Sequence, residues 1–258
     1  MEYLQGGREN QIVRKGAVVH RPAGPWTPSV HALLRHVRVV GFTAVPEPLG
    51  FDDAGNEMVT FLSGEVCNYP LSAAAASQEA LVSAAHLLRV YHEATRSFLA
   101  QNLESHTWQL PTQTPVEVIC HGDFAPYNVV LNGRRAVGII DFDTAHPGPR
   151  IWDIAYALYR WAPFTHPQNP DGRGDLETQI GRARLFCEAY GFPVAQRHAL
   201  VEMMILRLQT LVNHMQAEAQ KGNEAFIANL ADGHHLLYQA DIAYLGKKRP
   251  FILAGLQG

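Results

Sequence analysis

The sequence has few cysteines and no pair of histidines or cysteines spaced as metal ligands. Its 258 residues include three cysteines, Cys67, Cys120 and Cys187. An odd number of cysteines without ligand spacing disfavours both a disulfide framework and a zinc site. We therefore expect free thiols in a reducing cytoplasm.

Long apolar runs and a surplus of charge of one sign are also missing. No uninterrupted apolar stretch approaches the roughly 18 residues that a membrane span requires, so we expect no membrane partner. The chain has 21 basic and 24 acidic residues, a net charge of -3 with neutral histidines. This balance disfavours a nucleic-acid binder. The first 16 residues lack the apolar segment of a signal peptide, and we expect a cytoplasmic location.

The most informative part of the chain is residues 116–143, VEVICHGDFAPYNVVLNGRRAVGIIDFD. Residues 116–120, 129–131 and 136–140 are short, β-branched and apolar, which is typical of buried strands. Asn132 and Gly133 join the second and third runs and are a strong signal for a hairpin. The segment from His121 to Asn128 is too polar and too rich in Gly and Pro to be strand or helix. We predict a scaffold of small strands that brings Asp123, Asn128 and Asp141 to one edge.

These three side chains are of the types that phosphoryl transfer needs. Oxygen ligands hold Mg²⁺ against the phosphates, and a carboxylate orients or deprotonates the attacking hydroxyl. The order of base, amide ligand and carboxylate ligand is that of a protein-kinase catalytic loop followed by its metal-binding loop. Here the two loops are His-Gly-Asp and Asp-Phe-Asp.

The pattern His-Gly-Asp-x-x-x-x-Asn followed by Ile-Asp-Phe-Asp resembles the aminoglycoside phosphotransferase family, which also includes choline and homoserine kinases. The likeness is specific over residues 119–156. It implies an α+β, protein-kinase-like fold of two lobes: a short antiparallel-sheet N-terminal lobe (residues 1–63) that binds nucleotide, and a mainly helical C-terminal lobe (residues 64–258) for catalysis and substrate binding.

The resemblance also implies roles for individual residues. Asp123 would be the catalytic base, with His121 bracing its loop, and Asn128 and Asp141 would be the Mg²⁺ ligands. Asp153, in the Trp-Asp-Ile-Ala continuation of the pattern, is interpreted as a structural carboxylate that accepts hydrogen bonds from the catalytic loop. For Asp143, an outer contact with metal or phosphate and a purely local hydrogen bond both stay open.

The N-terminal 63 residues depart from the family pattern. A strand lysine fixed by a helix glutamate normally contacts the phosphates, but here the strand ends with His20 and Arg21 and the helix has His31. Successive strand residues face opposite sides, so one of His20 and Arg21 faces the cleft. We favour Arg21 as the phosphate contact, with a surface charge as the alternative. Gly6 and Gly7 could form a nucleotide-covering turn, although a plain turn fits as well.

Local patterns predict the remaining elements. We expect strands over residues 11–14, 17–20, 45–49 and 58–62, and helices over residues 27–40, 77–99, 154–161, 176–190, 194–219 and 224–245. Thr27 is the expected N-cap of the first helix, followed by Pro28. Residues 163–175 are rich in Pro, Gly and Asp, which predicts an exposed loop that could border the acceptor.

The sequence predicts a small-molecule kinase that transfers the γ-phosphoryl of ATP or GTP, with Mg²⁺, to a hydroxyl of an aminoglycoside-like or other small acceptor. The alternative is a pseudokinase-like nucleotide-binding regulator, because the lysine and glutamate pair is missing. A protein kinase is disfavoured, since only a few residues separate Asp143 from Gly148. Acidic and basic residues are mixed in the C-terminal helices, so the pattern identifies neither the acceptor nor the oligomeric state.

Overall fold

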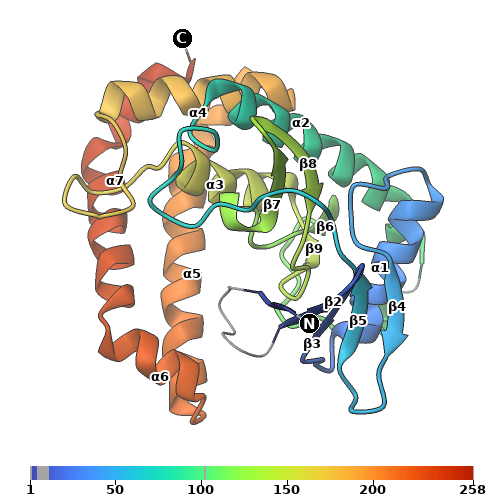
Figure 1. The fold of residues 1–258 in the computed structure, drawn as a ribbon. Helices are drawn as coiled ribbons and strands as arrows, with labels where there is room; N and C mark the ends of the chain where they lie inside the picture. The colour runs from blue at the N-terminus through green and yellow to red at the C-terminus, as the bar shows by residue number, and fades with distance from the viewer. Residues whose placement is uncertain (1, 5–11, 102, 258) are drawn as a thin grey trace.

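A small sheet and a larger, mainly helical part lie side by side in the computed structural model, which describes residues 2–4, 12–101 and 103–257 (Figure 1). The N-terminal elements are β1 (Glu2–Tyr3), β2 (Val13–Lys15), β3 (Val18–Arg21), α1 (Thr27–Val39), β4 (Pro48–Phe51) and β5 (Glu57–Thr60). The strands form one antiparallel sheet in the order β1-β2-β3-β5-β4. This arrangement confirms the predicted two-lobed α+β fold, while the boundary after residue 63 stays a prediction.

Strand β3 places His20 and Arg21 on opposite faces of this sheet, as the alternation of a strand requires. His20 Nδ1 lies 2.9 Å from Asp52 Oδ2. Arg21 is paired across the sheet with Glu57 and lines the cleft. Arg21 is therefore the residue of the pair that faces the cleft.

Helix α1 joins the sheet to the rest of the protein through a buried face of Val30, Leu33, Leu34 and Val37. Its start differs from the prediction. Trp26 occupies the N-cap, and Thr27 is already inside the helix, where its hydroxyl accepts a hydrogen bond from Gly24 N at 2.9 Å. The proline is at the helix start as expected, because its missing N–H is not needed there.

Two small strand pairs carry the central stretch. They are β6 (Val118–Cys120) with β9 (His146–Gly148), and β7 (Val129–Asn132) with β8 (Arg135–Ile139), each antiparallel. The β7-β8 hairpin forms where the sequence predicted it, but Asn132 is the last residue of β7 and the turn consists of Gly133 and Arg134. Residues 121–128, which contain the predicted base Asp123 and are called the catalytic segment below, thus connect β6 to β7. The segment with Asp141 and Asp143 connects β8 to β9.

Helices make up most of the remaining chain: α2 (Gln78–Thr95), α3 (Arg150–Trp161), α4 (Leu176–Tyr190), α5 (Leu200–Gln220), α6 (Glu224–Ala231) and α7 (His234–Gln257), with 3₁₀ turns at Arg96–Ala100, Leu103–Ser105, Pro126–Asn128 and Val194–Ala199. In Figure 1, α5 and α7 run side by side in opposite directions. The single helix expected over residues 224–245 is wrong. The chain breaks at Gly233, whose φ of 79° ends the shorter helix, and α7 then continues to Gln257.

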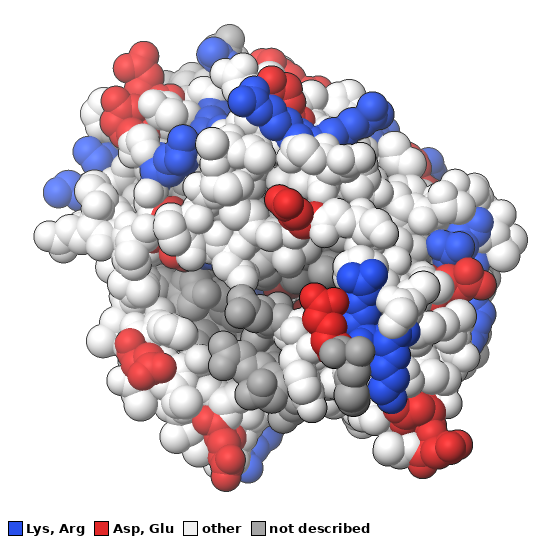
Figure 2. Space-filling model, in the orientation of Figure 1, with Lys and Arg blue, Asp and Glu red and all other residues white. Residues whose placement is uncertain are grey.

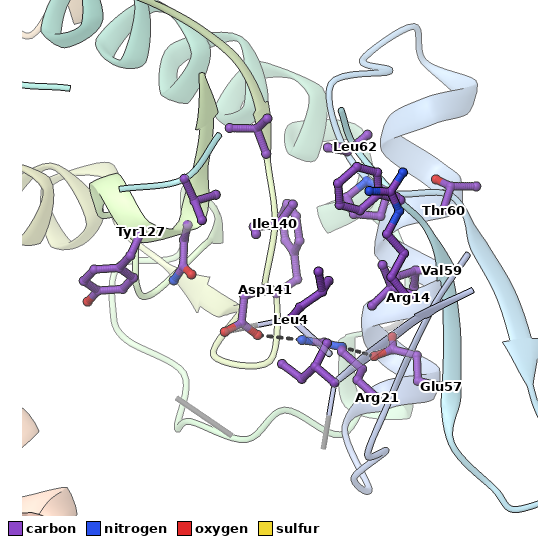
Figure 3. Close-up of a pocket in the computed structure, with 18 of the residues that line it drawn as sticks. Leu4, Arg14, Arg21, Glu57, Val59, Thr60, Leu62, Tyr127, Ile140 and Asp141 are labelled. Carbon is purple, nitrogen blue, oxygen red and sulfur yellow. Dashed lines mark hydrogen bonds and ion pairs between the residues drawn. The ribbon is translucent and has the colours of Figure 1, made fainter. Parts of the chain in front are cut away.

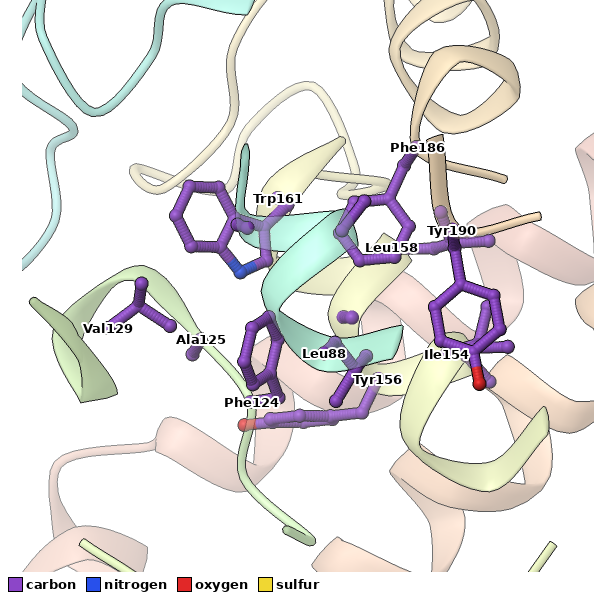
Figure 4. Packing of buried hydrophobic residues seen from close by; sticks show 14 of the residues in the cluster. Leu88, Phe124, Ala125, Val129, Ile154, Tyr156, Leu158, Trp161, Phe186 and Tyr190 are labelled. Atoms are coloured by element: carbon purple, nitrogen blue, oxygen red, sulfur yellow. The ribbon is translucent and has the colours of Figure 1, made fainter. Parts of the chain in front are cut away.

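One apolar core connects these elements, and it includes residues of the catalytic segment (Figure 4). Phe124, which follows the predicted base, is 0% exposed and its ring lies near that of Trp161 of α3. Burying a phenylalanine stabilises a fold by roughly 1.5–3 kcal/mol. The catalytic segment is therefore held by packing as well as by hydrogen bonds.

None of the helices among the described residues is both long enough and apolar enough to span a bilayer.

Candidate active site

A cleft of about 780 Å³ lies between the small sheet and the catalytic segment. Apolar side chains of both walls line it, including Val19, Val59, Leu62, Val130 and Ile140. The polar groups Arg21, Glu57, Asp123, Asn128 and Asp141 line it as well. Figure 3 labels Arg21, Glu57 and Asp141. An apolar cleft with a few convergent polar groups is the usual form of a small-molecule site.

Hydrogen bonds through Ile140 fasten the two catalytic segments to each other. Ile140 N donates to Asn128 O at 2.9 Å, and His121 Nε2 donates to Ile140 O at 2.9 Å. Because Ile140 directly precedes Asp141, these bonds place Asp141 beside the segment that carries Asp123 and Asn128. The structure thus brings the predicted base and both predicted metal ligands to one end of the cleft.

Both carboxylate oxygens of Asp123 receive hydrogen bonds from the same segment. The Tyr127 hydroxyl donates to Oδ1 at 2.7 Å, and Asn128 Nδ2 donates to Oδ2 at 2.9 Å. Burial raises the pKa of Asp123, an effect that the Tyr127 hydrogen bond opposes. A fixed carboxylate with a raised pKa is well suited to accept a proton from a bound hydroxyl.

Asp153 of α3 holds the turn before Asp123. Its carboxylate accepts from His121 N at 2.6 Å, from Gly122 N at 2.8 Å and from His92 Nε2 at 3.0 Å. Burial alone would raise the pKa of Asp153, but the hydrogen bond and charge of His92, with the backbone donors, hold it at about 2. These contacts agree with the structural role expected for Asp153.

Gly122 explains why the segment reads His-Gly-Asp. Its φ is 83°, and a Cβ at this position would lie 2.3 Å from Thr144 O. Its carbonyl also accepts a hydrogen bond from Arg207 of α5, whose guanidinium lies 4.5 Å from the centre of the Tyr156 ring. Only glycine combines this backbone conformation with so close an approach.

Asp141 and Asp143 both contact Arg21 across the cleft. Arg21 Nη1 donates to Asp141 Oδ1 at 2.7 Å, and Nη2 donates to Asp143 Oδ1. Asp141 has a φ of 61°, which is uncommon for a residue other than glycine and is typical of strained functional positions. Its side chain is 49% exposed, whereas that of Asp143 is 10% exposed.

Glu57 of β5 supplies a carboxylate that the sequence interpretation considered missing. Arg21 Nε donates to Glu57 Oε2, and His31 Nε2 of α1 lies 2.9 Å from Glu57 Oε1. Burial alone would raise the pKa of Glu57, but His31 and Arg21 lower it. Arg21 of β3 is thus held by Glu57 of strand β5, and His31 of helix α1 contacts the other oxygen of Glu57.

The oxygen atoms at this end of the cleft fit a magnesium ion. Asn128 Nδ2 donates to Asp123 O and Oδ2, which leaves Asn128 Oδ1 as the amide atom able to bind a cation. Mg²⁺ uses one or two carboxylates and keeps several waters, so it needs no all-protein cage. Among the described residues, no group of three or more His, Cys, Asp and Glu side chains is arranged as a metal site. A set of Asn128 and Asp141, with Asp143 nearby, is consistent with both facts.

The structure tests some sequence predictions more directly than others. Gly6 and Gly7 lie outside the described residues, and their nucleotide-covering turn stays a prediction. The residues that sequence reasoning missed are Glu57, Tyr127 and Arg207. Opposite charges at Arg21 and Glu57 would have been a usable signal, but only once the register that pairs them was known.

A family model and a relative of known name match this chain. Residues 96–190 match the family model APH, described as the phosphotransferase enzyme family. The trifolitoxin immunity protein of Rhizobium leguminosarum bv. trifolii is 31% identical over 226 residues, which cover 84% of this chain and 83% of the relative.

Solved structures share the fold at low sequence identity. A choline/ethanolamine kinase family protein from Mesorhizobium loti has a TM-score of 0.62 and 18% identity, covering 99% of this chain and 91% of the other. The amicoumacin kinase hAmiN, solved in complex with AMP-PNP, Ca²⁺ and Ami, has a TM-score of 0.59 and 12% identity, with coverage of 86% and 88%. These likenesses show the fold.

Proposed function

Because the chain belongs to the APH phosphotransferase enzyme family, we propose that it is a small-molecule kinase that transfers the γ-phosphoryl of ATP or GTP to a hydroxyl acceptor. The observation that carries this proposal is the convergence of Asp123, Asn128, Asp141 and Arg21 on one cleft. Tertiary contacts bring Arg21 and Asp141 to the loop that carries Asp123 and Asn128. Each of the four residues is of a type that phosphoryl transfer uses.

Each residue has a defined task in the proposed reaction. Asp123 accepts the proton of the acceptor hydroxyl. The hydroxyl oxygen then forms a bond to the γ-phosphorus, while the bond between the γ-phosphorus and the leaving nucleoside diphosphate breaks. Asn128 and Asp141 hold Mg²⁺, which when bound neutralises charge on the phosphate oxygens. Arg21 contacts the phosphates from the N-terminal sheet, and His121 keeps the two segments in register.

The alternative of an inactive nucleotide-binding regulator loses its main motivation. It was suggested by the missing pair of lysine and glutamate, but Arg21 and Glu57 form a cation and carboxylate pair in the same cleft. Guanidinium binds phosphate with two donors in a fixed plane, so an arginine is able to take the place of the lysine.

Two observations bear on the choice of acceptor. The face in Figure 2 has its charged side chains mostly around the edge and no continuous field of acidic residues that would favour a polycation. The relative named above is an immunity protein against trifolitoxin, which makes toxins reasonable candidates beside aminoglycosides and amino alcohols.

A phosphotransfer screen tests the proposed function. The protein is incubated with Mg²⁺ and labelled ATP or GTP against aminoglycosides, amino alcohols, sugars and trifolitoxin. We expect label on one acceptor class and none with the Asp123→Asn variant. Nucleotide binding without transfer to any acceptor, and without slow nucleotide hydrolysis, would contradict the proposal and favour the regulator.

Substitution of Asp141 tests the proposed metal site. Asp141→Asn should weaken Mg·AMP-PNP binding by about a hundredfold, because the amide has no charge and only one oxygen for the cation. Isothermal titration calorimetry in Mg²⁺ measures this loss. Asp53→Asn, an exposed substitution after β4, is the matched control and should leave the affinity unchanged. Equal affinities of Asp141→Asn and wild type would show that Asp141 is not a ligand.

A further inference from the structure

Arg21 places a positive charge directly on the two aspartates of the proposed metal segment. Its two Nη atoms contact Asp141 and Asp143 separately, and its side chain is only 12% exposed. Figure 3 shows Arg21 between Asp141 and Glu57. Like charges repel strongly at such distances where water is largely excluded. A divalent cation that approaches these carboxylates therefore meets a guanidinium already bound to them.

The same guanidinium has a third contact that does not involve the aspartates. Arg21 Nε donates to Glu57, whose side chain is 1% exposed and is held on its other oxygen by His31. Because Nε and the Nη atoms have different partners, Arg21 is able to release Asp141 and Asp143 while it remains attached to Glu57. The N-terminal sheet thus keeps the guanidinium of Arg21 in the cleft in either arrangement.

Charge balance suggests when this exchange takes place. Of these four side chains, Glu57, Asp141 and Asp143 carry three negative charges and Arg21 carries one positive charge. A divalent cation brings the sum for this group to zero, and the phosphates of a nucleotide then add negative charge that Arg21 can contact. A divalent cation without nucleotide offers Arg21 no new partner, so it has to compete with the guanidinium for the carboxylates.

We propose that Arg21 is an internal counter-cation of the metal site, which weakens binding of a divalent cation alone and moves to the phosphates when cation and nucleotide bind together. The proposal rests on the proposed function for the identity of the ligand. Its consequence is coupling: the cleft discriminates against the free cation and selects the cation already bound to nucleotide.

Binding of Mn²⁺ to purified full-length variants, measured by electron paramagnetic resonance, tests this proposal. Arg21→Gln should bind Mn²⁺ alone about tenfold more tightly than wild type, because the repulsive charge is gone. The same variant should bind Mn·AMP-PNP about tenfold more weakly, because a phosphate contact is lost. A single substitution would then shift the two affinities in opposite directions.

Two further variants serve as controls. Arg21→Lys keeps the charge and should bind Mn²⁺ alone within about threefold of wild type. Arg14→Gln removes a charge from the same cleft wall, where Arg14 lies over the Phe61 ring at 3.7 Å and contacts Glu2 at 3.6 Å. Because Arg14 contacts Glu2, Gly16 O and the Phe61 ring in the described part of the chain, its removal should change Mn²⁺ affinity by less than about threefold.

A wild-type measurement covers the case in which Arg21→Gln does not fold. The side-chain Nη–H signals of Arg21, assigned in ¹⁵N NMR spectra by their loss in Arg21→Lys, should shift on addition of Mg·AMP-PNP, because the Nη atoms exchange Asp141 and Asp143 for phosphates. Unchanged Nη–H signals would overturn the proposal.

The outcomes of the Mn²⁺ binding experiment separate this proposal from the proposed function. Mn²⁺ affinity of Arg21→Gln equal to that of wild type, or an equal gain in Arg21→Lys, would overturn the counter-cation role, whether or not phosphate is transferred. A wild-type protein that shows the predicted Mn²⁺ shifts but transfers no phosphate would refute the kinase and leave the counter-cation role supported. The two failures are therefore distinguishable.

Discussion

The Asp123→Asn variant is expected to lose about a thousandfold in kcat for phosphotransfer while its affinity for Mg·ATP stays within about threefold of wild type. Asparagine has nearly the shape of aspartate, and the Tyr127 hydroxyl at 2.7 Å still has an oxygen to which it can donate. The amide cannot accept the proton of the acceptor hydroxyl. Single-turnover assays with labelled ATP and calorimetric binding measure the two quantities.

Asp232→Asn is a suitable control for this experiment, because it makes the same chemical change outside the cleft. Asp232 is exposed and lies at the end of α6. Its kcat should equal that of wild type. If Asp123→Asn keeps more than about a tenth of wild-type kcat, Asp123 is not the base. A large loss of Mg·ATP affinity would instead indicate that Asp123 acts mainly at the metal.

The pH dependence of kcat adds a second check on Asp123. Burial raises the pKa of this carboxylate above its ordinary value. A base must be unprotonated to work, so activity should fall as the pH is lowered through the raised pKa, at a higher pH than an exposed aspartate would show. A rate that is flat down to the ordinary pKa of an aspartate, about 4, would contradict this.

Replacing Asp153 by asparagine should destabilise the fold by about 3–5 kcal/mol, because one partner of a buried polar network is removed. The asparagine NH₂ would face a backbone N–H of His121 or Gly122, both of which now donate to the carboxylate. His92 would lose its charged partner as well. Urea unfolding measures the change in the free energy of unfolding, and Asp232→Asn, with an exposed side chain, should unfold like wild type.

Activity of the Asp153→Asn variant distinguishes this network from simple packing. Loosening of the turn that carries Asp123 should lower kcat even at temperatures where the variant is folded. A variant that unfolds more easily but has wild-type kcat when folded would show that Asp153 stabilises the fold without positioning the catalytic segment.

The pH dependence of stability follows from the lowered pKa of Asp153, about 2 in the fold against an ordinary value of about 4 in the unfolded chain. A group whose pKa is lower in the folded state stabilises the fold above its unfolded pKa and loses this contribution as the pH falls through its folded pKa. The difference in unfolding free energy between wild type and Asp153→Asn should therefore shrink as the pH falls from about 4 to about 2. A difference that does not change over this range would mean that the carboxylate is not charged in the fold.

The local elements of this protein could be predicted from short stretches of sequence. The β7-β8 hairpin, which Asn132 and Gly133 signal, and helix α4, which ends with Gly191 as its C-cap, depend on residues a few positions apart, because backbone propensities act over that range. The spacing of Asp123 and Asn128 places both side chains on one loop for the same reason. The sequence was misleading where a cap or a break decided the boundary, as at Thr27 and Gly233.

Contacts between distant parts of the chain were decided by the tertiary structure alone. Arg21 contacts Glu57 because the register of β3 and β5 pairs the two residues. It contacts Asp141, 120 positions away, because the small sheet packs against the segment between β8 and β9. The partner of a charged side chain depends on which opposite charge the tertiary packing brings close to it. Local sequence patterns do not predict that partner. The sequence by itself therefore determined which residue types are available for the proposed chemistry, and the packing of the two lobes determined that Arg21 faces them, because that contact joins residues far apart in the chain.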